Sequence, residues 1–184
     1  MSIATRPLTL KSFLALPETK PASDFINGNV IQKPMPQGEH SRLQSKLSAV
    51  INQFGEEHKV AYAFTELRCS FGNGSIVPDI AVVRWENIPR TASGRVANRF
   101  FLPPDWAVEI LSPEQSATVV LEKLLKCSEY GTEIGWLIDP KEETVLLVLS
   151  DRRVRLLRGE AVLPVLPGIE LSLTVSQIFA WLKF

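Results

Sequence analysis

The sequence predicts a mixed α/β fold in which helices cover a central β-sheet. Segments with helical spacing of apolar residues alternate along the chain with short apolar segments rich in β-branched residues. Glycine- and asparagine-rich turns join some of the short apolar segments directly, which indicates antiparallel neighbours. Because 184 residues, 45% of them apolar, suffice for one substantial core, we expect residues 1–184 to form a single domain.

The first third of the chain predicts two helices and a hairpin. Residues 8–17 should form a short helix capped by Thr9. The dipeptide Asn27-Gly28 lies between apolar residues and predicts a tight hairpin. Residues 40–57 carry apolar side chains at helical spacing and should form a long helix.

The middle of the chain supplies the predicted core strands. Residues 60–71 alternate enough to form one strand, and the turn at 72–75 leads into a second strand at 76–83. We expect these two strands to be antiparallel neighbours. After a polar, arginine-rich connection, residues 105–111 read as a further core strand.

The last third of the chain alternates in the same way. Ser112 and Gln115 match a capping box, which predicts a helix from Pro113 to about residue 130. Residues 135–140 should form a core strand, and residues 144–158 should form a hairpin. Thr174 is then expected to cap an amphipathic helix at the end of the chain.

Composition and charge exclude several classes of protein. The formal net charge is zero, which argues against a general basic coat for nucleic acid. No apolar run approaches the ~20 residues of a membrane span, and no secretory signal is evident, so we expect a cytoplasmic protein. Cys69 and Cys127 are too few for a disulfide framework and should be small core residues.

Two acids interrupt the predicted core strands. Asp79 follows Pro78 at the start of one strand, and Glu109 lies inside the next. If the strands pair, alternation places both carboxylates on the same side, about 4.8 Å apart in strand spacing. A hard divalent cation between them would offset their repulsion. Alternatively, each acid pairs separately with an arginine or lies at a solvated strand end.

A lysine in the following helix could join the acids. At strand and helix rise, the helix after Glu109 would fold back and bring Lys123 near the carboxylates. Helical side chains also tilt toward the N-terminus, which favours this approach. Lys126 starts one turn further away and is the weaker candidate. Lys123 could equally be a solvated helix lysine.

Four segments give the chain a resemblance to a known family. The segments "VPDIAVVRW", "PPDWAVEILSPEQS", the helix with Lys123, and "GWLIDP" resemble the Uma-type endonuclease family. That family belongs to the PD-(D/E)XK, restriction-endonuclease-like superfamily. The resemblance covers nearly the whole chain and implies a restriction-endonuclease-like fold, a central mixed sheet flanked by helices.

The resemblance also implies a metal-dependent phosphodiesterase site. Asp79 matches the aspartate of the PD motif, and Glu109 matches the acid of the second half-motif. These two residues and the carbonyl of Ile110 would hold Mg²⁺ or Mn²⁺. The superfamily pattern puts lysine where this chain has Leu111, so Lys123 would take the lysine's role and orient the attacking water or stabilise charge.

Other residues are weaker candidates for the site. Glu39 and Glu66 could be additional acids, although surface acids are ordinary. His40 opens the long helix and should have a capping or surface role. DNA is the implied substrate, with phosphate contacts from the arginines between the two acidic strands. These arginines, which could instead be solvated loop charges, are Arg84, Arg90, Arg95 and Arg99.

The sequence therefore leaves several function classes open. The leading hypothesis is a metal-dependent DNA endonuclease. The alternative is a nuclease-derived module that binds DNA or a protein without turnover, which neutral charge and Leu111 favour. A metal-dependent hydrolase acting on another substrate is a third hypothesis. A homodimer is expected by analogy, because cleavage of two strands often uses paired sites.

Overall fold

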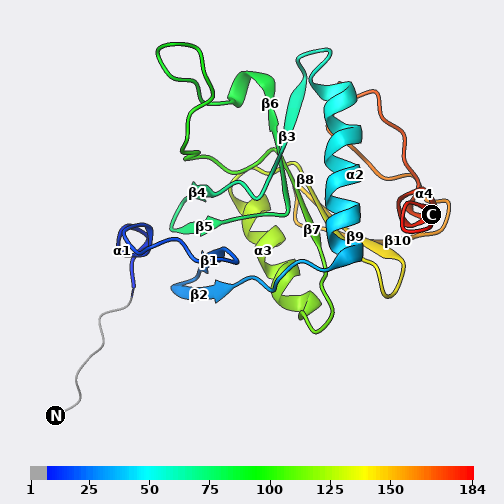
Figure 1. Cartoon of the computed structure of the whole chain (residues 1–184), viewed down its shortest axis with the longest axis horizontal. Helices are drawn as coiled ribbons and strands as arrows, with labels where there is room; N and C mark the ends of the chain where they lie inside the picture. The colour runs from blue at the N-terminus through cyan, green and yellow to red at the C-terminus, as the bar shows by residue number, and fades with distance from the viewer. Residues whose placement is uncertain (1–7) are drawn as a thin grey trace.

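The computed structural model describes residues 8–184 and has the predicted mixed α/β fold (Figure 1). In this described part, the strands form a large mixed sheet and a smaller antiparallel sheet, whereas we expected one central sheet. The large sheet has the order β10-β9-β8-β7-β6-β3, and only its β7–β8 pair is parallel. The order of the small sheet is β2-β1-β5-β4.

The described chain begins with the short helix α1 and ends with the short helix α4. The large sheet contains β3 (Ala61–Thr65), β6 (Ile80–Arg84), β7 (Trp106–Ile110), β8 (Ile134–Asp139), β9 (Thr144–Leu149) and β10 (Val154–Arg158). The small sheet contains β1 (Ser23–Ile26), β2 (Asn29–Gln32), β4 (Cys69–Phe71) and β5 (Gly74–Ile76). The helices are α1 (Leu10–Leu14), α2 (Gly38–Gly55), α3 (Ala117–Glu129) and α4 (Val175–Ala180), with the 3-10 turn η1 (Trp85–Asn87).

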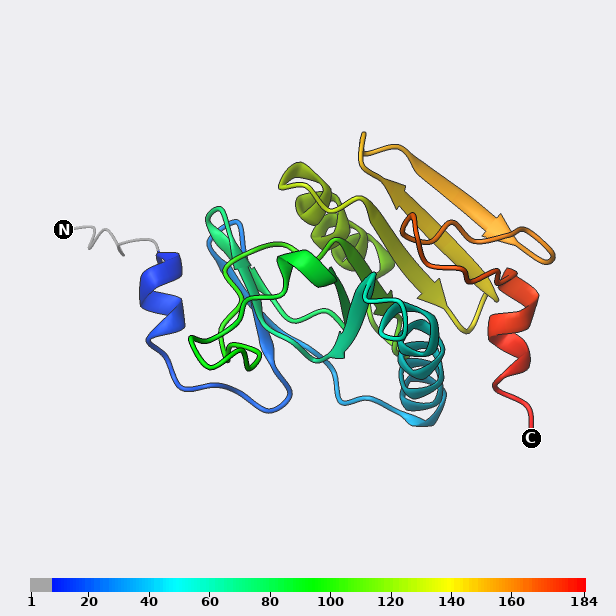
Figure 2. The ribbon, with the colours of Figure 1, turned by 90° about the horizontal axis from the view of Figure 1, so that it is seen from above.

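Helices cover both faces of the large sheet (Figure 2). Leu43 and Leu47 of α2 and Ile178 of α4 pack on one face, in the larger of the buried apolar clusters. On the other face, α3 packs through Leu124 and Cys127 in a second cluster, which also includes side chains of the small sheet. Asp79 and Glu109 lie on the side of α3, because this second cluster contains their same-face neighbours Ala81 and Ala107.

Two of the predicted strands are divided between the sheets. Residues 60–71 form β3 and β4 rather than one strand, because Glu66 adopts a left-handed conformation with φ of 52°. Residues 76–83 are likewise interrupted between Ile76 and Ile80. The antiparallel pairing that we predicted holds in both halves, as β4 with β5 and β3 with β6. Asp79 therefore lies where the chain crosses from the small sheet to the large one.

The start of α3 differs from the prediction. The helix begins at Ala117, not at Pro113, because Glu114 has φ of 70° and cannot belong to a helix. Gln115 still accepts a hydrogen bond from the Ser112 amide at 3.2 Å, which is half of the predicted capping box. The later start places Lys123 in the second turn of α3.

Several local predictions are confirmed. Thr9 caps α1, Asn27-Gly28 joins β1 to β2, and Thr174 caps α4 with Gln177 in a full capping box. Cys69 and Cys127 are buried and free. Among residues 8–184, no helix has the length and apolar character needed to cross a bilayer. The prediction about a secretory signal concerns the N-terminus, and residues 1–7 lie outside the described residues.

Candidate active site

The two acids face each other across the β6–β7 pair. These strands are antiparallel, with Ile80 opposite Val108 and Ala81 opposite Ala107. Extending this register by one residue places Asp79 opposite Glu109, on the face that α3 covers. Both residues are buried, with exposed fractions of 1% and 2%. The pairing that we predicted from strand alternation is confirmed.

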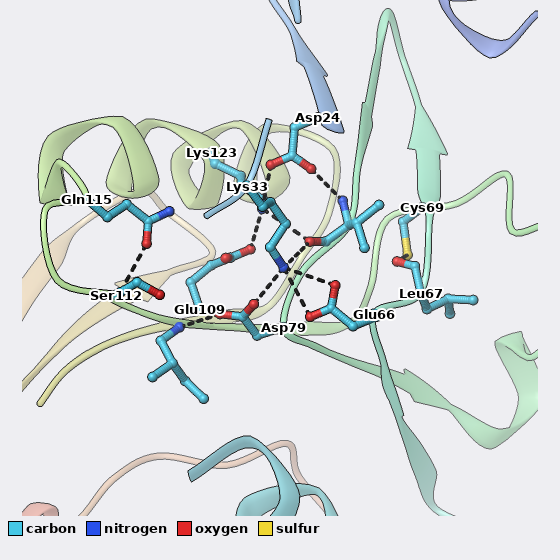
Figure 3. Close-up of polar contacts among 12 residues, drawn as sticks. Asp24, Lys33, Glu66, Leu67, Cys69, Asp79, Glu109, Ser112, Gln115 and Lys123 are labelled. Atoms are coloured by element: carbon cyan, nitrogen blue, oxygen red, sulfur yellow. Dashed lines mark hydrogen bonds and ion pairs between the residues drawn. The ribbon is translucent and has the colours of Figure 1, made fainter. Parts of the chain in front are cut away.

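Donors from three separate segments surround Asp79. Its Oδ2 accepts a hydrogen bond from the Ile110 amide at 2.7 Å and lies 3.1 Å from His40 Nε2. The Lys33 ammonium donates to its Oδ1 at 2.6 Å (Figure 3). Burial alone would raise the pKa of Asp79, but the His40 hydrogen bond and the Lys33 charge outweigh burial and hold that pKa below its usual value.

Glu109 has a different environment. Burial raises the pKa of its carboxyl to about 7, although the nearby Lys123 charge opposes the rise. The Lys123 ammonium lies 2.7 Å from Glu109 Oε1. This oxygen nevertheless lacks a hydrogen-bond partner among the described residues. Lys123 is therefore the charge partner of this oxygen, in an ion pair that does not have hydrogen-bond geometry.

Lys123 joins the two sheets. Its Nζ lies 2.7 Å from Asp24 Oδ2 on β1 and donates to the carbonyl of Val77 at 3.3 Å. Asp24 also accepts a hydrogen bond from the Val77 amide at 2.7 Å. Burial lowers the pKa of Lys123, but the Glu109 and Asp24 carboxylates outweigh it and raise that pKa. The predicted proximity of Lys123 to the acids is confirmed.

Neither Lys126 nor position 111 supplies an ammonium to the acids. Lys126, the weaker candidate, forms an ion pair with Glu129 at 3.2 Å on the outer side of α3. Leu111, which stands where the superfamily pattern has lysine, is 8% exposed and packs in the apolar cluster beneath α3. No ammonium can therefore come from that position.

Three residues of the site were missed by sequence reasoning. Asp24 and Lys33 lie in and just after the predicted hairpin, and nothing in their local pattern signals contact with residues far along the chain. His40 was expected to cap a helix or lie at the surface, which is wrong: it is 6% exposed and contacts Asp79. A histidine in the first turn of a long amphipathic helix, on the same side as Leu43 and Leu47, was the available signal.

A cavity of about 240 Å³ lies beside Asp79. Its polar wall includes Lys33, His40, Gln44 and Glu66, but not Lys123 or Glu109. Glu66 accepts hydrogen bonds here from Lys33 at 3.3 Å and from Gln44 at 3.0 Å. Of the two additional acids that we considered, the structure thus brings Glu66 to the cavity.

Glu39 lies elsewhere. It lines a neighbouring hollow of about 690 Å³, together with Lys141 and Glu142 after β8. The two hollows share Ser112 and Gln115 in their walls. Glu39 is exposed and has no contact with Asp79 among the described interactions.

Comparisons with known proteins show the family of the chain and support its fold. Residues 10–176 match the model of the Uma2 family, which is described as "Putative restriction endonuclease". The chain belongs to the Uma2 family. A solved structure from Anabaena variabilis ATCC 29413, described as "a putative nuclease belonging to DUF820", is 48% identical and has a TM-score of 0.93. The match covers 96% of this chain and 99% of that chain, and no curated protein matches.

Restriction-endonuclease-like families such as Uma2 generally use divalent metal ions. Among residues 8–184, no group of three or more His, Cys, Asp or Glu side chains is placed to hold a metal ion. Mg²⁺ needs no such group, because it is commonly bound by one or two carboxylates, water and substrate phosphate. Asp79 and Glu109, two buried carboxylates on adjacent strands, fit this mode of binding.

The structure does not bring the four arginines to the acids of this Uma2 chain. Arg84 lies at the other end of β6 and pairs with Glu133 at 2.8 Å. Arg90 lies over the Trp85 ring at 5.8 Å, and Arg95 is exposed on the same connection. Arg99 lines a separate hollow with Glu18 and Arg68. None of the four lines the cavity beside Asp79.

Proposed function

We propose that this Uma2 chain is a divalent-metal-dependent DNA endonuclease that hydrolyses phosphodiester bonds. The observation that carries the proposal is the buried pair Asp79 and Glu109, which lie opposite each other on adjacent strands beside a cavity. Two buried carboxylates repel each other. Lys33 and Lys123 offset this repulsion in the structure, and in the proposal a divalent cation offsets it further. The family assignment supports the same reaction.

In this proposal, Asp79, Glu109 and the carbonyl of Ile110 hold Mg²⁺ or Mn²⁺. The bound cation would polarise a phosphate oxygen and lower the pKa of a water molecule. Asp79 stays ionised near neutral pH because of its hydrogen bonds and the Lys33 charge. Lys123 favours the ionised form of Glu109, which burial would otherwise keep protonated. Since Asp24, Glu109 and Val77 enclose its ammonium, Lys123 acts here as a positioning residue rather than as a contact to water.

The peripheral residues have lesser roles in the proposal. Glu66, on the cavity wall, orients Lys33 and Gln44. Glu39, in the neighbouring hollow, stays a candidate for an additional acid. The arginines would meet the DNA away from the acids, as contacts that position the duplex without reading its sequence. These arginines are Arg84, Arg90, Arg95 and Arg99. Arg84 would contribute least, because Glu133 already neutralises it.

Plasmid nicking in Mg²⁺ or Mn²⁺ tests the proposed reaction. Wild type should nick, EDTA should abolish nicking, and Asp79→Asn should lower the rate at least 100-fold, about the effect of removing one essential polar group. Asp105→Asn is the matched control, because Asp105 lies at the opposite end of the same strands, bonded to the Arg84 amide. Equal loss in both variants, or nicking that survives Asp79→Asn, would reject the site.

One observation favours a second candidate function. With Leu111 buried where a lysine is usual, the chain could be a module that binds DNA without cutting it. Retardation of a duplex without nicking, under conditions where Mn²⁺ binds, would support that module. Cleavage that depends on Asp79 would exclude it.

Assembly and location remain predictions. We expect a homodimer in the cytoplasm, in keeping with cleavage of both strands of a duplex. Light scattering after size-exclusion chromatography should give twice the 20.5 kDa mass of the chain. A monomeric mass with full activity would contradict the expected dimer.

A further inference from the structure

Two lysines approach the acids, but only one faces the cavity. The Lys123 ammonium is enclosed by Asp24, Glu109 and the Val77 carbonyl, and it does not line the cavity beside Asp79. Lys33 lines that cavity. In Figure 3 the two ammonium groups approach the acids from different elements, α3 and the segment after β2. A bound phosphate in the cavity would meet Lys33 and not Lys123.

The contacts of Lys33 are those of a cation held by acids. Its Nζ lies 2.6 Å from Asp79 Oδ1, 2.9 Å from the Val77 carbonyl and 3.3 Å from Glu66 Oε1. Burial lowers the pKa of Lys33, but the charges of Glu109 and Asp79 outweigh burial and raise it. Both acids therefore act on this ammonium, which stays charged while its side chain is only 9% exposed.

The two oxygens of Asp79 differ in a way that matters for Lys33. Oδ2 is held by the Ile110 amide and His40, whereas the contact of Oδ1 is with Lys33. A divalent cation that binds Asp79 through Oδ1 must compete with this ammonium. The lysine stem is flexible, so the displaced ammonium can turn into the cavity that it already lines.

On the basis of the nuclease function proposed above, we propose that Lys33 is a catalytic residue whose ammonium contacts the scissile phosphate. In the hydrolysis, a water oxygen bonds to phosphorus while one ester P–O bond breaks. The water gives up one proton, and the leaving oxygen gains one, so a hydroxyl end and a phosphate monoester end result. Lys33 transfers no proton and stabilises the negative charge that develops on the phosphate oxygens.

The proposal predicts opposite effects on cation binding and on cleavage. Removing the Lys33 charge frees Asp79 Oδ1, so the affinity for Mn²⁺ should rise about tenfold, as expected for loss of a like charge at contact distance. The same change removes a charge from the phosphate, so nicking should fall about 100-fold or more. A residue with a merely structural role would weaken both.

The experiment compares Lys33→Met, Lys33→Arg and the control Lys126→Met. Lys126 is the matched control, because its ion pair with Glu129 lies outside the cavity. Binding of Mn²⁺ alone is measured by calorimetry without DNA, and nicking of a supercoiled plasmid is measured in Mn²⁺. Lys33→Met should bind Mn²⁺ more tightly and nick slowly, Lys33→Arg should recover part of the rate, and Lys126→Met should match wild type.

Each outcome decides the proposal. Nicking by Lys33→Met within threefold of wild type, or loss of nicking together with weaker Mn²⁺ binding, would overturn the role of Lys33. If wild type itself fails to nick, the nuclease proposal fails. The calorimetry then still decides whether Lys33 occupies the cation position: tighter Mn²⁺ binding by Lys33→Met supports it, and unchanged or weaker binding rejects it.

Discussion

The two ends of the β6–β7 pair carry charges in very different settings. At one end Asp79 and Glu109 are buried and meet Lys33 and Lys123, which are also buried or nearly so. At the other end, Arg84 pairs with Glu133, and the side chains are 21% and 39% exposed. Both ends therefore pair opposite charges, but only one of them removes the charges from water.

The difference between the two ends supports the placement of the proposed site at the buried end. A half-exposed ion pair retains most of its hydration and contributes little to stability. A buried network loses hydration that its Coulombic attraction only partly offsets, so it is poor as a stabilising device. Such a network, bordering a cavity, supports the site that we propose.

The largest expected effect on stability comes from removing the charge of Lys123 at the buried end. Lys123→Met leaves Asp24 and Glu109 buried without their shared partner, so the free energy of unfolding should fall by about 3–5 kcal/mol. Urea unfolding at pH 7 measures this change. Lys126→Met, three residues further along α3, should cost less than about 1 kcal/mol. Equal losses of unfolding free energy in the two variants would mean that the Lys123 ion pairs matter no more for stability than the ion pair of Lys126.

A smaller effect should appear in the pH dependence of stability. Asp79 has a lowered pKa, so its contribution is present above its ordinary value near 3.8 and is lost as pH falls below it. Glu109 has a raised pKa of about 7, so its contribution is complete below its ordinary value of 4.5 and is lost as pH rises through 7.

Urea unfolding between pH 3 and pH 8 tests both signs. In Asp79→Asn, the free energy of unfolding should fall less steeply at acid pH than in wild type. In Glu109→Gln, it should fall less steeply between about pH 4.5 and 7. Each slope should change by at most about 1.4 kcal/mol per pH unit. Arg84→Met should leave the pH dependence of the free energy of unfolding unchanged in both ranges. If either acid variant keeps the wild-type profile, the assigned environment of that carboxyl is incorrect.

The smallest effect should come from the exposed end. Arg84→Met breaks the ion pair with Glu133, and the free energy of unfolding should fall by about 0.5–1 kcal/mol after screening by solvent. The loss should shrink further in 1 M salt. Thermal unfolding at low and high salt measures it. A salt-independent loss above about 2 kcal/mol would contradict the contrast between the two ends.

Local patterns allowed much of the fold and part of the site to be predicted. The alternation of apolar residues gave the strand pairing and placed Asp79 and Glu109 on one face, and helix rise brought Lys123 to them. Periodicity did not reveal that the chain crosses between the two sheets after β3 and again before β6. The first crossing contains the left-handed residue Glu66, and the second contains Pro78. The start of α3 was misplaced for a similar reason, at Glu114.

The sequence by itself determined that the two acids share a face, because strand alternation places Asp79 and Glu109 on one side once their strands pair. Only the tertiary structure decided their partners. Lys33 reaches Asp79 across 46 residues and Asp24 reaches Lys123 across 99, through packing of the small sheet against α3. Such contacts join segments that carry no common period, so no local pattern encodes them, and burial then sets which charges meet.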